Sequence, residues 1–189
     1  MNKFLKDIAA RYNIEIEAVI DFMSHFMIAD IDKSELIVNK DGFNDEFYIL
    51  KEGIIRAFIP TESEDRTIWF GYPGQAFFDV WCYHWDKLSP IAIEAVTPSI
   101  VYHISKNKLE SLTGKSHSIS NTVRKIFEGH AAEMEESITN LFICDGGLER
   151  YLSILKHHPE LLQNVPLKKL ASYLQLAPQS LSRIRSLIK

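Results

Sequence analysis

The residues best suited to specific chemistry lie near the end of the chain, where Gln179, Ser180, Ser182, Arg183 and Arg185 are interleaved with apolar residues. An arginine can bind both acceptors of guanine in a fork, and a glutamine can pair with adenine. These residue types on one face of a short helix suit a protein that reads bases in the major groove. We take the five side chains as candidate DNA contacts; the alternative is a helical hairpin whose polar residues are merely solvated.

Two short helices separated by a tight turn must position these side chains. The second helix is predicted to begin at Pro178, since the missing N–H of proline costs nothing in the first turn. Apolar residues recur at helical spacing on both segments. They are Leu167, Leu170, Ala171 and Leu174 on the first, and Leu181, Ile184, Leu187 and Ile188 on the second.

Charge is distributed unevenly along the chain, whose net charge is −4. Residues 149–189 contain seven Lys/Arg and two acidic residues, a charge of +5, whereas the other 148 residues carry −9. A basic module on an acidic body suits a nucleic-acid partner at one end only. Lys168 and Lys169, on the first short helix, are candidate phosphate contacts, with solubility as the alternative role.

The bulk properties are those of an ordinary globular protein. The chain has 189 residues, of which 46% are hydrophobic and 24% charged. Cys82 and Cys144 are too few for a disulfide framework, and no stretch has the length and apolarity of a signal peptide or a membrane span. We therefore expect a cytoplasmic protein, without a cofactor, metal or membrane partner.

The residue pattern in the rest of the chain changes twice, from helical spacing to β-favouring runs and back to helical spacing. Helical spacing over residues 3–28 predicts two short helices, and β-favouring runs bounded by turn residues then predict a barrel or sandwich-like roll. Helical spacing returns with a short helix over 105–112 and a long one over 118–143. The predicted strands are 35–38, 46–50, 54–59, 67–70, 91–96 and 99–104.

The long helix carries apolar residues at alternating four- and three-residue spacing, which is typical of a coiled-coil seam. We predict that this seam forms a homodimer interface; the alternative is a helix buried on two sides within one chain. The seam residues are Phe127, Ala131, Met134, Ile138 and Leu141. Gly146 and Gly147 then end the helix and predict a C-cap and a hinge, before a helix over 148–158 that Pro159 stops.

This order of elements resembles the Crp/Fnr family of bacterial transcription regulators. Two stretches carry the resemblance, residues 47–58 in the strand region and residues 149–185 in the helical region. It implies an α+β fold with an N-terminal double-stranded β-helix, a jelly-roll-like roll of the cyclic-nucleotide-binding type. It also implies three domains: residues 1–115 as the sensor roll with N-terminal helices, 116–144 as the dimerisation helix and 145–189 as the helix-turn-helix domain.

The resemblance implies specific roles near the C-terminus. Gln179 stands where the family has a base-reading glutamate, and Arg183 stands at the family's arginine position. A carboxylate accepts from cytosine whereas glutamine prefers adenine, so we expect a half-site different from the family's usual one, within a pseudo-palindromic operator. The sequence ends at Lys189, and we expect no β-hairpin wing after the recognition helix.

The cyclic-nucleotide cassette of the family is altered. The family uses a Gly-Glu pair and a later Arg-Ser or Arg-Thr pair to bind the ribose and the cyclic phosphate. Here Phe78 and Asp79 replace Gly-Glu, Ser89 and Pro90 replace the second pair, and Lys87 is the only Lys or Arg between residues 67 and 104. We therefore predict that cyclic-nucleotide binding has been lost.

Aromatic residues crowd the same region and define a candidate pocket for an unidentified small-molecule effector. The alternative is a roll filled by its own side chains. The candidate pocket residues are Phe70, Tyr72, Phe77, Phe78, Asp79, Trp81 and Ser89.

Two other functions compete with transcription regulation. One is a module that binds a cyclic nucleotide or another small ligand without specific DNA activity, which the basic C-terminus disfavours. The other is a cupin-type metal enzyme, but His84, His103 and His117 are isolated and form no His-x-His pair. We expect a regulator rather than an enzyme.

Overall fold

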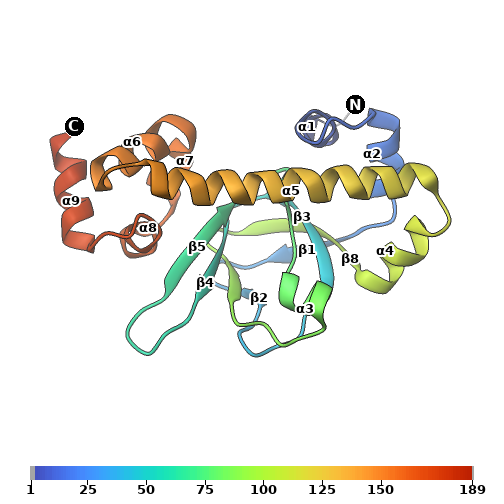
Figure 1. Ribbon diagram of the computed structural model, residues 1–189, viewed down its shortest axis with the longest axis horizontal. Helices are drawn as coiled ribbons and strands as arrows, with labels where there is room; N and C mark the ends of the chain where they lie inside the picture. The colour runs from blue at the N-terminus through green and yellow to red at the C-terminus, as the bar shows by residue number, and fades with distance from the viewer. Residues whose placement is uncertain (1–2, 189) are drawn as a thin grey trace.

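The computed structural model describes residues 3–188, apart from the side chain of Leu141. Its strands form two four-stranded antiparallel sheets, in the orders β1-β8-β3-β6 and β2-β7-β4-β5. The sheets pack together as a roll below helix α5 (Figure 1). The strands are β1 (Met27–Ile31), β2 (Leu36–Val38), β3 (Glu46–Glu52), β4 (Ile55–Ile59), β5 (Arg66–Gly71), β6 (Ala76–Phe77), β7 (Ala92–Ala95) and β8 (Ser99–Ser105).

Most of the helices lie along one side of the roll, and some extend past its end. Helix α5 lies across the sheets, with α1, α2 and α4 around its first half and α6 to α9 around its end (Figure 1). Within residues 3–188, no helix is both long and apolar enough to cross a membrane. The helices are α1 (Lys3–Arg11), α2 (Ile16–Met23), α3 (Val80–Trp85), α4 (Lys106–Thr113), α5 (His117–Ile143), α6 (Gly147–His157), α7 (Pro159–Asn164), α8 (Leu167–Tyr173) and α9 (Pro178–Leu187).

The six predicted strands and the predicted long helix are confirmed to within a few residues, whereas β1, β6, α3 and α7 were not predicted. Pro159 does more than stop α6, because it is the first residue of α7, where proline is favoured. The prediction of a glycine C-cap on α5 is wrong. Cys144 caps α5 in an extended conformation, and Gly146 is the N-cap residue of α6.

Strand β3 is buried on both faces, which explains its continuous run of apolar residues. Tyr48 and Leu50 face the interior of the roll, where the Tyr48 ring stacks on Phe77 with centroids 4.8 Å apart. Phe47 and Ile49 face the opposite way, into a cluster formed with the N-terminal helices and α5. Strand β3 therefore contributes side chains to two separate cores.

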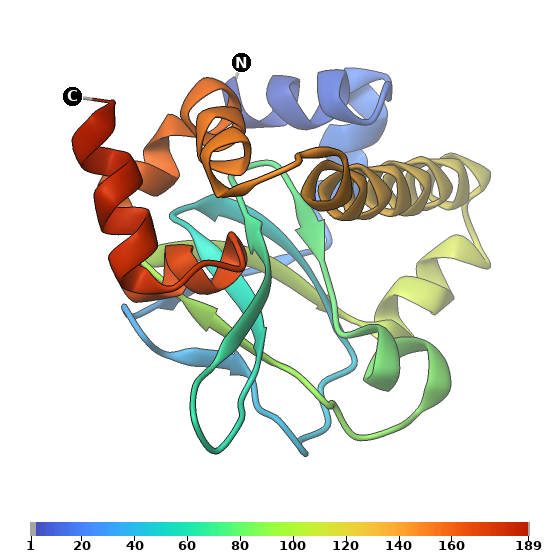
Figure 2. The ribbon, with the colours of Figure 1, turned by 60° about the vertical axis from the view of Figure 1, so that its left-hand side comes forward.

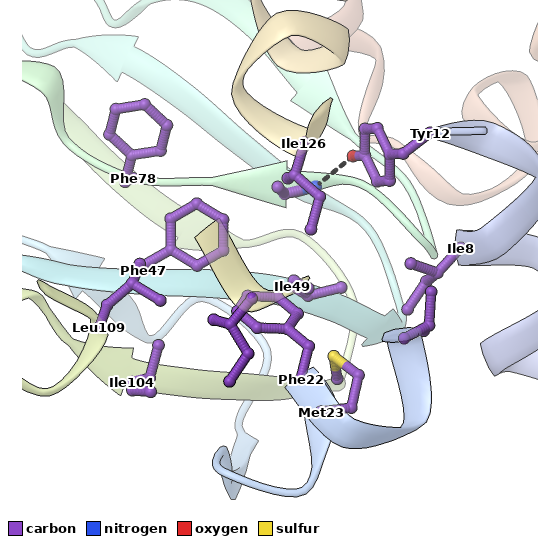
Figure 3. Packing of buried hydrophobic residues seen from close by; sticks show 13 residues of the cluster. Ile8, Tyr12, Phe22, Met23, Phe47, Ile49, Phe78, Ile104, Leu109 and Ile126 are labelled. Atoms are coloured by element: carbon purple, nitrogen blue, oxygen red, sulfur yellow. Dashed lines mark hydrogen bonds between the residues drawn. The ribbon is translucent and has the colours of Figure 1, made fainter. Parts of the chain in front are cut away.

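The outer cluster fixes the first half of α5 on the roll (Figure 3). The Phe127 ring lies 5.5 Å from Phe47 and 4.9 Å from Phe78, centroid to centroid. Ile126 is fully buried in the same cluster. Hydrophobic burial of this kind stabilises a helix far more than its intrinsic propensity does.

Tyr12, the residue that follows α1, makes a close contact with Gly129 on α5. The Tyr12 hydroxyl accepts a hydrogen bond of 2.9 Å from the Ala76 backbone N–H, and only 4% of Tyr12 is exposed (Figure 3). A Cβ atom on Gly129 would lie 2.5 Å from Cδ1 of the Tyr12 ring. Because this ring is buried and hydrogen-bonded, it cannot swing aside to make room.

Gly129→Ala is expected to destabilise the fold by about 1–3 kcal/mol, since overpacking a tight contact costs that much. Helix propensity alone predicts the opposite sign, because alanine is favoured over glycine in helices by about 1 kcal/mol. Denaturant unfolding followed by circular dichroism measures the difference. Gly114→Ala is the control, because an added Cβ there meets no described atom closer than 3.5 Å. A Gly129→Ala protein as stable as the wild type would contradict the packing argument.

Candidate nucleic-acid interface

Helix α9 is amphipathic, and its apolar side is anchored. Leu181 is fully buried, and Ile184 and Ile188 pack against the same cluster. The helix begins at Pro178, as predicted from the sequence. The turn before it passes through Gln175, whose φ of +57° lies in the left-handed region that non-glycine residues seldom adopt.

The opposite face of α9 is open to solvent. Gln179, Ser180, Ser182 and Arg183 are all exposed. Gln179 and Arg183 stand one helical turn apart, and within residues 3–188 neither side chain is held by another residue. Free donors and acceptors on a helix that is braced from behind are what direct base reading requires.

The basic residues of the helical module, defined here as α6 to α9, divide into two groups. Lys156, Lys168 and Arg183 are exposed. Three others bind within the protein: Lys169 to Glu94 on the roll, Arg185 to the Leu162 carbonyl at 3.3 Å, and Arg150 to the Leu174 carbonyl at 2.7 Å. Lys168 and Arg183 thus remain exposed candidates for DNA contact, whereas Lys169 and Arg185 have structural partners.

The module is small and closes its core on the roll. Helix α8 lies beside β5 (Figure 2). Ile54, Phe70 and Val96 of the roll are buried in one cluster with residues of α6 to α9. The Phe70 ring meets Tyr173 edge to face at 5.2 Å. The helical module and the roll therefore share an apolar core.

Gly147, predicted as part of a hinge, lies close to the Leu176 side chain. An added Cβ atom would lie 2.5 Å from a methyl carbon of Leu176, in the turn before α9. The first residue of α6 therefore packs against the turn that precedes α9, the candidate DNA-reading helix.

A charged cluster also joins the module to the roll, and the sequence analysis did not identify it. Arg56 on β4 is 2% exposed and binds Glu94, which stands opposite it on β7, as well as Asp65. Lys169 binds the same Glu94 oxygen. The available signal was a single charge in each of two apolar runs, Ile55–Phe58 and Ile91–Val96. Pairing them required the strand register.

The seven candidate pocket residues do not converge. Phe77 lies in the roll interior, Phe78 packs against α5, and Phe70 and Tyr72 lie at the junction with the helical module. The other three lie around α3 and the loop after it. Trp81 is 38% exposed, Asp79 caps α3 and Ser89 donates to the Ile91 carbonyl at 2.8 Å.

Asp79 takes the position where the resemblance placed a ribose-binding glutamate. It is fully buried, and its carboxylate accepts from the Trp81 backbone N–H at 2.9 Å. The Cys82 thiol lies 3.4 Å from the other carboxylate oxygen, and burial is the main cause that raises the pKa of this thiol. Because this carboxylate is buried and caps α3, it does not face a ligand as a ribose-binding carboxylate would.

A cavity of about 360 Å³ lies where β5, α5, α6 and α8 meet. Tyr72 and Tyr173 line it, and burial raises the pKa of both hydroxyls, so they remain neutral. The Tyr72 ring stacks on His158 with centroids 4.2 Å apart. In the part of the chain that the structure describes, no group of three or more His, Cys, Asp or Glu residues is placed to hold a metal ion.

The predicted dimer seam is divided between two environments. Phe127 packs on the roll and Met134 lines the junction cavity, so both face their own chain. Ala131 and Ile138 are exposed, the latter by 56%. Leu141 was also assigned to the seam, but its side chain is outside the described part of the structure.

Apolar side chains are exposed along the part of α5 that extends past the roll and on α6. Besides Ile138, the end of α5 exposes Phe142 by 80% and Ile143 by 69%. Helix α6 adds Leu148, Leu152 and Leu155, each at least 40% exposed. Exposed apolar side chains that cluster in this way mark an interaction surface.

Comparison with known proteins identifies the fold. No family model matches the sequence, and no curated protein matches it. Solved structures do match, including FixK2 from Bradyrhizobium japonicum, with a TM-score of 0.69 at 18% identity over 86% of this chain and 84% of that one. The c-di-GMP responsive global regulator CLP from Xanthomonas campestris matches with a TM-score of 0.70 at 12% identity, over 92% of this chain and 91% of that one.

A third solved structure, described as a transcriptional regulator of the Crp/Fnr family from Eubacterium rectale, matches with a TM-score of 0.66 at 12% identity. The match covers 93% of this chain and 83% of that one. None of these three proteins is described as an enzyme. The chain thus has the Crp/Fnr-type fold, a cyclic-nucleotide-binding-like roll followed by a helical domain, and the predicted fold class is confirmed.

Proposed function

We propose that this protein is a DNA-binding transcription regulator of Crp/Fnr type that works in the cytoplasm as a homodimer on a pseudo-palindromic operator. The observation that carries the proposal is the free Gln179–Arg183 face of α9, which is backed by the buried Leu181. The fold shared with FixK2 and CLP supports it. So does the basic charge of the C-terminal region on an acidic body.

The proposal assigns one task to each part of the chain. Residues 1–115 form a sensor-type roll with N-terminal helices, residues 116–144 dimerise, and residues 145–189 bind DNA. Gln179, Ser180, Ser182 and Arg183 face the bases or the adjacent backbone. Lys168 contacts a phosphate, while Lys169 and Arg185 act indirectly by holding the module in shape.

The proposed regulator does not bind a cyclic nucleotide. Asp79 is buried at the start of α3, and Phe77 stacks on Tyr48 inside the roll. The carboxylate that would bind the ribose is thus used as a helix cap, and aromatic side chains fill the core where the family resemblance puts the nucleotide. An effector would then act from a different site.

Selection of bound fragments from random double-stranded DNA tests the reading helix. We expect the wild-type protein to enrich a pseudo-palindrome, and Arg183→Ala to weaken binding to it by about ten- to a hundredfold, since a bidentate base contact is worth about 1–3 kcal/mol. Lys156→Ala is the matched control, because it removes an exposed positive charge from α6 instead. Failure to enrich any sequence, or equal losses in both variants, would refute the proposed function.

Ile138→Glu is expected to convert the homodimer to a monomer, because it places a charge in the exposed apolar surface that a second copy would cover. The change should leave the fold intact, since this side chain is already 56% exposed. Sedimentation velocity at micromolar concentration measures the mass. Thr139→Glu adds the same charge at the neighbouring exposed position and should stay dimeric. A dimer that survives Ile138→Glu would place the interface elsewhere.

Calorimetric titration with cyclic AMP tests the altered cassette. We expect no binding tighter than about 1 mM, which corresponds to no more than about 4 kcal/mol. The physical reason is the absence of an arginine fork together with the buried Asp79 carboxylate. A micromolar dissociation constant would show that the roll has kept a nucleotide site by other means.

A further inference from the structure

We infer that the charged cluster of Arg56, Asp65, Glu94 and Lys169 holds the helical module in one orientation on the roll, and that it thereby sets the spacing between the two DNA half-sites. This inference rests on the proposed function and deepens it. Arg56, Glu94 and Lys169 act as positioning residues, which never touch DNA themselves.

The roll supplies a pre-arranged acceptor for the module. The Arg56 guanidinium binds Glu94, donates to Asp65 Oδ2 at 2.7 Å and donates to Thr67 Oγ1 at 3.0 Å. It also lies 4.1 Å from the centroid of the Phe58 ring. With these partners, a fully buried arginine has little freedom to move, so Glu94 is held at a fixed position on the face of the roll.

The cluster is electrically balanced only when the module is docked. Arg56 carries one positive charge and its two carboxylate partners carry two negative charges. Lys169 on α8 supplies the fourth charge by binding the Glu94 oxygen that Arg56 also binds. Glu94 is 7% exposed, so an unpaired negative charge there would be costly.

Three hydrogen bonds between α8 and the start of β5 add directional contacts to this ion pairing. The Ser172 hydroxyl donates to the Asp65 carbonyl at 2.8 Å and accepts from the Thr67 N–H at 2.9 Å. The Thr67 hydroxyl donates to the Lys169 carbonyl at 3.3 Å. Lys169 and Ser172 lie three residues apart on one side of α8, so these bonds fix both the position and the rotation of the helix on β5.

The docked orientation is the one in which α9 presents its polar face to solvent. A dimer reads two half-sites about 34–36 Å apart, one turn of DNA, only if both reading helices are held at that separation. A module that is held by an apolar patch alone can slide or rotate, because hydrophobic contact is not directional. Charge pairing and hydrogen bonds therefore determine how strictly the protein discriminates between spacings.

The test compares Lys169→Met with Lys168→Met on operators whose half-sites are separated by the selected spacer or by one to three base pairs more or less. We expect the wild-type protein to prefer one spacer by about tenfold or more. Lys169→Met keeps the alkyl stem and loses the charge, and it should reduce this preference several-fold while leaving the preferred half-site sequence unchanged. Lys168→Met, at the neighbouring exposed position that forms no ion pair in the described structure, should weaken all spacers equally.

A second variant and a measurement without DNA make the outcome decisive. Ser172→Ala removes two of the three hydrogen bonds with no change of charge, and it should also flatten the spacer profile. Hydrogen exchange of the α8 backbone should become several-fold faster in Lys169→Met and Ser172→Ala, but not in Lys168→Met.

Two results would overturn the inference, and they are distinguishable from failure of the proposed function. One is a wild-type spacer profile in Lys169→Met and Ser172→Ala; the other is unchanged hydrogen exchange in both. A wild-type protein that enriches no DNA would refute the proposed function and the spacing role together. Hydrogen exchange would then still decide whether the cluster holds α8 on the roll.

Discussion

The contact between helix α8 and strand β5 is the interaction on which the rest of the molecule depends. The helical module is too small to bury its own apolar face, and Ile54, Phe70 and Val96 of the roll complete its core. The apolar part of this contact supplies most of the free energy of docking. The charged part, around the buried Arg56, contributes less to stability, since desolvation offsets much of the pairing, and it selects one orientation.

This constraint explains why α5 has two different halves. Its first half is covered by the roll through Ile119 and Ile126, both buried. Its second half extends beyond the roll to reach the helical module and exposes Ile138 and Phe142. In the proposed dimer, a second copy covers the exposed apolar residues of this second half.

The sequence was sufficient for the elements that have a strong hydrophobic period, but not for the contacts between them. Strand β6 has two residues and α3 has six, too few for either period to emerge. The heptad pattern of α5 could not distinguish Phe127, which faces the roll, from Ile138, which faces solvent, because both are apolar at coiled-coil spacing.

In the candidate sites, too, features set by local spacing could be predicted, whereas contacts between elements could not. The polar face of α9 depends on local spacing within one helix, and four of its five predicted residues are exposed, whereas Arg185 is half-buried. The aromatic pocket failed to converge because adjacent residues on a strand point to opposite faces, so that Phe77 and Phe78 entered different cores. The Arg56–Glu94 pair could not be found from one-dimensional spacing, since 38 residues separate its members and only the β4–β7 register brings them together.

The filled interior of the roll limits how a ligand could control the proposed regulator. In a ligand-gated sensor, binding energy must favour one of two arrangements of the reading domain. Here Tyr48 and Phe77 fill the interior of the roll, and Asp79 occupies the start of α3. In the proposed regulator, a roll completed by its own side chains would act as a rigid platform, and the docked arrangement already exposes the polar face of α9. Control of DNA binding would then act on the junction or on dimerisation, where the described structure retains a cavity and exposed apolar surface.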